Sequence, residues 1–134
     1  MRQSKNFTLE ANILDPVNRR RGYGAVVVRD GMVEKLEITG PEKDNTPYLM
    51  PGFMDAHIHI ESSMLTPPAF ARLAVRHGTV ATVSDPHEIA NVLGLPGVRL
   101  MHDEALAMPT NVYVQMPSCV PSAPGLETPG AELG

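Results

Sequence analysis

From Met50 onward, strand-like and helix-like segments alternate along the sequence, and this alternation constrains the fold more than any other feature. Strands are predicted at about Gly52–Ile60, Thr79–Ser84 and Asn111–Met116. Helical patterns fill the intervals between them. The order strand, helix, strand, helix, strand implies parallel strands joined by right-handed crossovers. We therefore predict an α/β fold for residues 51–134.

Capping residues and breakers set the boundaries of the predicted helices. Thr66 is predicted as the N-cap of the first helix, with Pro67 at its first position, and Gly78 is expected to end it. Asp85 is expected to cap a short helix after the second strand, and a longer helix is predicted from about Gly97 to Ala107. The helices therefore lie where crossovers between parallel strands are required.

The first 50 residues differ in pattern and indicate small β-structure followed by a linker. Segments Gly24–Arg29 and Met32–Ile38 are strand-like, and the Asp30-Gly31 dipeptide between them is a strong hairpin signal. Residues 39–49 contain two prolines, an aspartate and an asparagine, and are predicted to be a loop. We therefore predict one domain segment over residues 1–50 and another over 51–134.

The predicted strand Gly52–Ile60 carries the most informative side chains of the chain. His57 and His59 project from one face with Asp55 behind them, because alternate residues of a strand point the same way. The opposite face is apolar and is expected to be buried. It consists of Met54, Ala56, Ile58 and Ile60. Two neutral imidazoles about 6–7 Å apart along a strand can converge on one divalent metal ion, although a lone histidine is more often structural.

Charge and composition exclude several classes of partner. A net charge of −4 at pH 7, with no basic patch beyond one arginine triplet, argues against nucleic acid as a partner. No apolar run approaches the roughly 18 residues of a membrane span, so no membrane partner is predicted. Cys119 is the single cysteine, which rules out an internal disulfide and fits a cytoplasmic location.

Three segments resemble the adenine deaminase family of the amidohydrolase superfamily: His57–Leu65, Ser84–Gly94 and Pro117–Pro121. The stretch Pro51–His59 by itself resembles the first barrel strand of the whole superfamily. The resemblance implies the amino-terminal part of a metal-dependent (β/α)8 barrel, preceded by a small β-domain segment. It also implies hydrolytic deamination of adenine to hypoxanthine and ammonia, a reaction of purine salvage.

The resemblance also implies roles for individual residues. His57 and His59 are implied to be ligands of a divalent metal, manganese or iron, with zinc as a further candidate. Substrate contact or an auxiliary metal site is implied for a second group, namely Glu61, Ser62, Asp85, His87 and Glu88. For Asp85 and Glu88 the alternative is a capping box at a helix start, which needs no ligand. The catalytic acid/base is expected beyond Gly134.

The chain is short for the fold that it resembles, since a (β/α)8 barrel takes roughly 250 residues. Residues 51–134 provide two to three βα units at roughly 30 residues each. We therefore expect the amino-terminal part of a larger enzyme, homo-oligomeric and acting on a small purine, and we expect this chain alone to be inactive. The alternatives are an amidohydrolase acting on a cyclic amide, dihydroorotase-like or imidazolonepropionase-like, or a non-catalytic truncated fragment.

Overall fold

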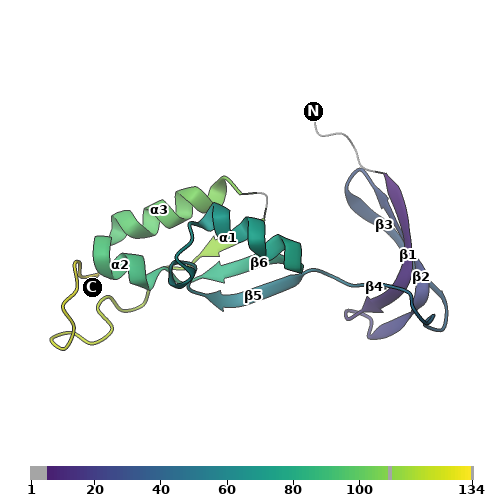
Figure 1. Ribbon diagram of the computed structural model, residues 1–134, viewed down its shortest axis with the longest axis horizontal. Coiled ribbons are helices and arrows are strands. Elements are labelled where there is room, and N and C mark those ends of the chain that lie inside the picture. The colour runs from purple at the N-terminus through teal and green to yellow at the C-terminus, as the bar shows by residue number, and fades with distance from the viewer. Residues whose placement is uncertain (1–5, 109, 134) are drawn as a thin grey trace. The chain divides into compact units, whose positions relative to one another are not determined.

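The computed structural model describes residues 6–108 and 110–133 of the chain. The chain divides into two units at the Pro51–Gly52 junction, and each unit has its own β-sheet (Figure 1). The first unit contains strands only, and the second contains strands and helices. The position expected for the catalytic acid/base, beyond Gly134, lies outside the described residues.

The sheet of the first unit has four strands in the order β3-β2-β1-β4. β1 and β3 each pair antiparallel with β2, and β4 runs parallel to β1. The strand bounds are β1 Phe7–Asp15, β2 Arg20–Arg29, β3 Met32–Gly40 and β4 Tyr48–Leu49. Ile13, Val26 and Val28 form the buried core of this unit, and Ile38 and Leu49 pack against it.

The hairpin predicted around Asp30 and Gly31 is confirmed as the β2–β3 connection. Both residues have left-handed backbone angles, with φ of 50° and 78°, as a two-residue type I′ turn requires. The sequence prediction omits β1, although apolar and polar residues alternate along it, and it treats β4 as loop. A strand of two residues is too short to leave a periodic signal.

The sheet of the second unit has three parallel strands in the order β5-β6-β7, as the alternation of elements predicts. β6 spans Thr79–Ser84, the predicted bounds, whereas β5 spans Phe53–Ile58 and β7 spans Asn111–Val114. β5 is shorter than predicted because the chain turns into a helical conformation at Ile60, where φ is −61° and ψ is −38°. His59 therefore lies just past the end of its strand.

Helices and 3₁₀ turns connect the strands of the second unit, and Figure 1 shows α1, α2 and α3 on the same side of its sheet. Their bounds are η1 Glu61–Ser63, α1 Pro67–Ala74, η2 Val75–His77, α2 His87–Leu93 and α3 Leu95–Leu106. Thr66 precedes α1 in an extended conformation and Gly78 follows η2 at a φ of 89°, so both predicted boundaries are confirmed. Within the described residues, no helix combines the length and apolar character that a membrane span requires.

Two predictions about this unit need correction. The long helix begins at Leu95, two residues before the predicted Gly97, because Pro96 suits a first helical turn. Of the apolar face predicted to be buried, Met54 is 62% accessible, Ala56 is exposed and Ile58 is half-buried, and Ile60, which lies past the end of β5, is fully buried. The cause is the position of the strand, since β5 has a neighbouring strand on one side only among the described residues and the helices pack against one another and β7.

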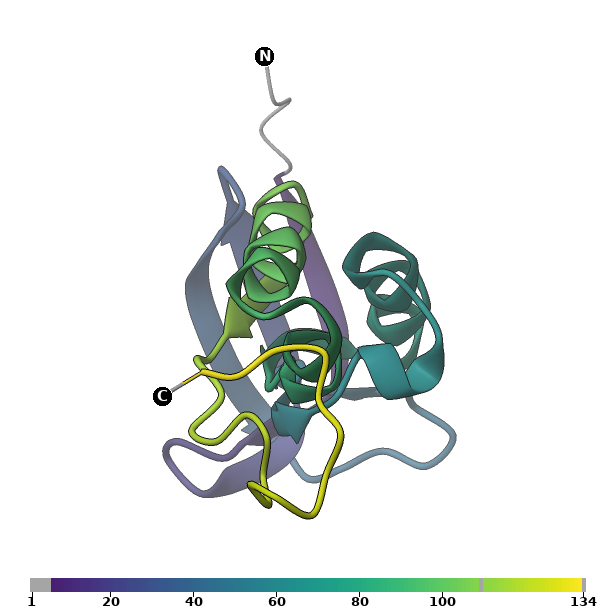
Figure 2. The ribbon, with the colours of Figure 1, turned by 90° about the vertical axis from the view of Figure 1, so that its left-hand side faces the viewer.

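The segment after β7 returns to α2 and lies beside it (Figure 2). The amides of Gly130 and Ala131 donate to the carbonyl of Asn91 at 2.8 and 3.1 Å. Asn91 lies in the last turn of α2, so these bonds satisfy a carbonyl that the helix itself leaves unpaired. The segment therefore fixes the position of α2, whose first turn carries candidate site residues.

Candidate metal centre

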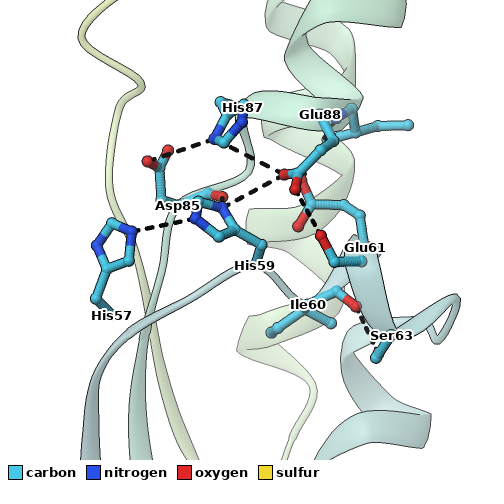
Figure 3. Close-up of polar contacts among 10 residues, drawn as sticks. His57, His59, Ile60, Glu61, Ser63, Asp85, His87 and Glu88 are labelled. Atoms are coloured by element: carbon cyan, nitrogen blue, oxygen red, sulfur yellow. Dashed lines mark hydrogen bonds and ion pairs between the residues drawn. The ribbon is translucent and has the colours of Figure 1, made fainter.

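The side chains that the sequence singles out meet where β5 and β6 end (Figure 3). His57 lies near the end of β5 and His59 directly after it, while Asp85 follows β6. His87 and Glu88 form the start of α2. Because the carboxyl ends of parallel strands share one edge of a sheet, residues distant in sequence converge there.

The rings of His57 and His59 converge on one point. His57 Nε2 and His59 Nε2 are 3.2 Å apart, and the rings meet edge to face at 79°. Two donor atoms that each bind one ion at about 2.1 Å are separated by about 3.0–3.4 Å in octahedral or tetrahedral coordination. The observed separation of the two nitrogens therefore fits a pair of ligands to a single divalent ion.

The orientation of His59 is set by the neighbouring strand end. Its Nδ1–H donates to the backbone carbonyl of Asp85 at 2.8 Å, which leaves the Nε2 lone pair directed toward His57. This hydrogen bond is the main cause of a raised pKa for His59. Burial opposes the rise, and the charges of Glu88 and other nearby carboxylates add to it.

The Asp85 side chain supplies a third potential donor. Its Oδ2 lies 3.6 Å from His87 Nδ1, while its Oδ1 is buried with no hydrogen-bond partner in the described part of the chain. Donor atoms of His57, His59 and Asp85 all lie within 4.8 Å of one another. A buried carboxylate oxygen without a partner is unfavourable unless a cation lies nearby, so Asp85 also fits a metal.

Glu88 bridges between the two strand ends. Its Oε1 accepts a hydrogen bond from the Ser62 hydroxyl at 2.6 Å, and its Oε2 lies 3.4 Å from His59 Nδ1 and 3.8 Å from His87 Nδ1. Burial raises the pKa of Glu88, but the Ser62 hydrogen bond and the two histidines outweigh it, and the net shift is downward. His59, His87 and Glu88 form a second group whose donor atoms lie within 4.8 Å of one another.

Glu61 is a further partly buried carboxyl of this edge. Its Oε1 accepts a long hydrogen bond of 3.4 Å from the amide of Ile89, and its Oε2 is buried without a partner among residues 6–108 and 110–133. Burial raises the pKa of Glu61, and the nearby charge of Glu88 contributes to the rise. The structure thus brings together every residue in the predicted site group.

The capping-box interpretation of Asp85 and Glu88 is wrong. The residue that precedes α2 is Pro86, and no side chain among the described residues caps the helix. The Asp85 carboxylate is instead directed toward His87, and the Glu88 carboxylate binds Ser62. The Glu88 carboxylate therefore reaches the loop after β5, and neither carboxylate caps the helix.

Comparison with known proteins identifies the family. A model of the amidohydrolase family matches residues 48–132. The chain belongs to the amidohydrolase family. Amidohydrolases generally depend on divalent metal, and the matched residues of this amidohydrolase chain include all of the candidate metal centre.

Relatives of this amidohydrolase chain carry the name adenine deaminase. The chain is 71% identical over 86 residues to such a protein from Mesorhizobium japonicum, covering 64% of this chain and 14% of that protein. It is 52% identical over 120 residues to one from Roseobacter denitrificans, covering 84% and 20%. For Parabacteroides distasonis the identity is 47% over 131 residues, covering 98% and 24%. The chain therefore spans at most about a quarter of the length of these curated relatives.

Proposed function

We propose that the protein containing this chain is a metal-dependent hydrolase that converts adenine and water to hypoxanthine and ammonia. The observation that carries the proposal is the convergence of His57 Nε2 and His59 Nε2 at 3.2 Å. It occurs in a chain that is 71% identical to a relative named adenine deaminase. The proposal concerns the whole protein, because the chain covers 14% of that relative.

We assign His57 and His59 as ligands of a divalent ion, with Asp85 as a third donor. Manganese and iron are the first candidates for this ion, and zinc is a further candidate. When bound, the ion supplies the Lewis acidity that activates water for attack on C6 of adenine. The Asp85 carbonyl keeps the His59 proton on Nδ1, so that Nε2 stays available to the ion. Ionised carboxylates at this edge balance the charge of a bound cation.

The remaining residues are assigned to a second position at the same edge. His87 and Glu88 present donor atoms beside His59 and are proposed to hold an auxiliary metal or to contact substrate. Glu61 and Ser62 border this position through their contacts with the first turn of α2. The leaving ammonia needs a proton donor, which we propose comes from a later strand of the whole protein.

The proposed fold of the whole protein is a (β/α)8 barrel. Residues 51–134 would form its first two to three βα units, and residues 1–50 would belong to a small β-domain. Three parallel strands in chain order, with helices on one side, support this arrangement. We further propose a homo-oligomer that acts in purine salvage in the cytoplasm, with a small-molecule substrate and without nucleic-acid or membrane partners.

The product of the full coding sequence tests the proposal. Replacing His57→Asn and His59→Asn together is expected to remove bound metal and abolish ammonia release from adenine, because asparagine offers a weaker donor than imidazole. His77→Asn is the matched control, since His77 is an exposed residue of η2. Elemental analysis and an ammonia assay are the measurements.

Two results would contradict the proposed function. Full metal content in the double histidine variant would refute the ligand assignment. A purified wild-type protein that ignores adenine but opens a cyclic amide such as dihydroorotate would move the protein to another amidohydrolase activity.

A further inference from the structure

Two loops meet at the candidate metal centre, and two side chains of η1 form hydrogen bonds with the first turn of α2. The loop after β5 contains η1, and the loop after β6 leads into α2. The Ser62 hydroxyl of η1 donates to Glu88 Oε1 at 2.6 Å. The Ile89 amide donates to Glu61 Oε1 at 3.4 Å, which is a longer and weaker contact. Ser62 therefore makes the shorter of the two links between η1 and α2, and it is also shorter than the 2.8 Å bond from His59 Nδ1 to the Asp85 carbonyl.

The Ser62 hydrogen bond sets the direction of the Glu88 carboxylate. With Oε1 on Ser62, Oε2 is directed toward two imidazoles, at 3.4 Å from His59 Nδ1 and 3.8 Å from His87 Nδ1 (Figure 3). This Oε2 is buried without a hydrogen-bond partner in the described chain, although 37% of the side chain is exposed. Water would solvate that oxygen better, so a carboxylate released by Ser62 would swing outward.

His59 in turn depends on the direction of Glu88. Its Nδ1 faces two oxygens, the Asp85 carbonyl at 2.8 Å and Glu88 Oε2 at 3.4 Å. Both acceptors favour a proton on Nδ1 and keep the ring in the orientation that places Nε2 3.2 Å from His57 Nε2. Loss of one acceptor would let the ring rotate away from its partner.

We propose that Ser62 is a positioning residue of the metal centre. Its hydroxyl holds Glu88 Oε2 beside His59 Nδ1, and through Glu88 it holds His59 Nε2 in place for the ion. The inference rests on the metal-binding role proposed above for His57 and His59. It gives Ser62 no contact with ion or substrate, in contrast to the direct contact that the family resemblance implies.

The size of the effect follows from the distance of Ser62 from the ion. Changing an outer partner of a metal-bound histidine typically lowers metal affinity or activity by about 10–100-fold. Ser62 acts through a second side chain, so we expect a value near the lower end of that range. Because the inference gives Ser62 no direct contact with adenine, we expect kcat to fall by a larger factor than any change in KM.

The test uses the product of the full coding sequence loaded with Mn²⁺. Ser62→Ala is expected to release Mn²⁺ to EDTA about 10-fold faster than wild type. Ser62→Thr keeps the hydroxyl and is expected to restore slow release. Ser63→Ala is the matched control, because the Ser63 hydroxyl in the same turn donates to the Ile60 carbonyl at 2.6 Å and its loss should leave release unchanged.

A double variant separates this role from a general effect on folding. Ser62→Ala combined with Glu88→Gln is expected to release Mn²⁺ no faster than Glu88→Gln alone, because Ser62 acts through Glu88. Additive effects would overturn the inference, as would Ser62→Ala protein that turns over adenine normally and retains Mn²⁺ as long as wild type. A wild-type protein that retains none of Mn²⁺, Fe²⁺ and Zn²⁺ would overturn the proposed function together with the inference.

Discussion

Asp85 contributes two different groups to the candidate metal centre. Its backbone carbonyl accepts from His59 Nδ1 at 2.8 Å, and its carboxylate presents a buried Oδ1 without a partner in the described residues. Such an oxygen loses hydration on folding and gains no hydrogen bond, so it destabilises the metal-free protein. The same oxygen becomes favourable beside a cation. A side chain that destabilises the metal-free protein and stabilises the metal-bound protein is therefore expected to be a metal ligand.

We predict that Asp85→Asn weakens Mn²⁺ binding by about 10-fold or more. Changing a residue that only contacts a metal ligand already lowers metal affinity by about 10-fold, and changing a direct ligand should have at least that effect. The same change should leave the midpoint of thermal unfolding of the metal-free protein unchanged or raised, because it removes a buried unpaired charge. Asp55→Asn is the matched control, since among the described residues the Asp55 carboxylate accepts only from the amide of His57, at 3.1 Å. Thermal unfolding in the presence of Mn²⁺ and in the presence of EDTA measures the stability of the metal-bound and the metal-free protein. Equal destabilisation under both conditions would make Asp85 a structural residue.

The sequence could predict part of this site and not the rest. Strand alternation predicts that His57 and His59 face the same way, and their rings do converge. The contact between His59 and the Asp85 carbonyl leaves no signal in the sequence, because every residue has a carbonyl and only the pairing of β5 with β6 brings this one close. Glu88 was open to a local explanation because helix starts commonly use glutamate, whereas its real partner is 26 positions away.

At the scale of elements, the position of α2 depends on close contact with α3. A Cβ atom added at Gly97 would lie 2.7 Å from the backbone oxygen of Ile89, so only glycine allows the start of α3 to approach this closely. Ala90 and Val98 pack together behind this contact. The first turn of α2 carries His87 and Glu88, and the α2–α3 contact therefore supports the metal centre from behind.

Gly97→Ala is expected to move α2 and to destabilise the protein by about 1–3 kcal/mol, the range for overpacking a close contact. Metal binding should weaken as well, because the displaced helix carries Glu88. Gly40→Ala is the matched control, since a Cβ at Gly40 meets no atom within 4 Å. Chemical unfolding and Mn²⁺ titration are the measurements. A Gly97→Ala protein with unchanged stability and metal affinity would show that α2 can shift without affecting the site.

The β1–β2 turn gives a pH prediction at the same scale. The Asp15 carboxylate accepts hydrogen bonds from the Asn18 side chain at 2.8 Å, from Arg20 at 2.9 Å and from the Asn18 amide at 3.1 Å. These bonds, first that of the Asn18 side chain, lower the pKa of Asp15 to about 2. A lowered pKa stabilises the fold above the unfolded value of about 3.9, and the contribution disappears as pH falls from there toward about 2.

We therefore expect hydrogen-exchange protection of the β1 and β2 amides, corrected for intrinsic exchange, to fall as pH decreases from about 4 to about 2. Asp15→Asn should lower protection above this window and make it less dependent on pH within it. Asp30→Asn in the neighbouring hairpin turn is the control, because asparagine tolerates the left-handed conformation found there. An unchanged pH profile in Asp15→Asn would show that the turn does not depend on this carboxylate.

The secondary structure was predictable to different degrees along the chain. The ends of α1 and η2 were predictable, because Pro67 disfavours a helical conformation at Thr66 and glycine tolerates the left-handed φ of 89° at Gly78. The exposure of β5 was not predictable from its apolar alternation, because alternation reports which side chains share a face and not what covers that face. Burial of Met54 requires a partner surface that the described residues do not supply.

At the scale of the whole molecule, each unit exposes large apolar side chains. In the second unit Phe53 is 56% accessible, Met54 62% and Tyr113 55%. β5 and β7 each have one edge without a neighbouring strand among the described residues. Exposed apolar faces and unpaired edges favour association with other chains or with further segments of the same protein.

The 134-residue chain produced alone is therefore expected to associate or aggregate and to show no adenine turnover. Its exposed apolar side chains should bind a hydrophobic dye, and its two histidines with one aspartate should hold Mn²⁺ weakly, because they provide only part of a coordination shell. Size-exclusion chromatography with light scattering, dye fluorescence and an ammonia assay are the measurements, with the product of the full coding sequence as the matched control. The control should be monodisperse, bind little dye and release ammonia. A monodisperse monomer of the 134-residue chain that deaminated adenine at an enzyme-like rate would show that the described residues already contain a complete active site.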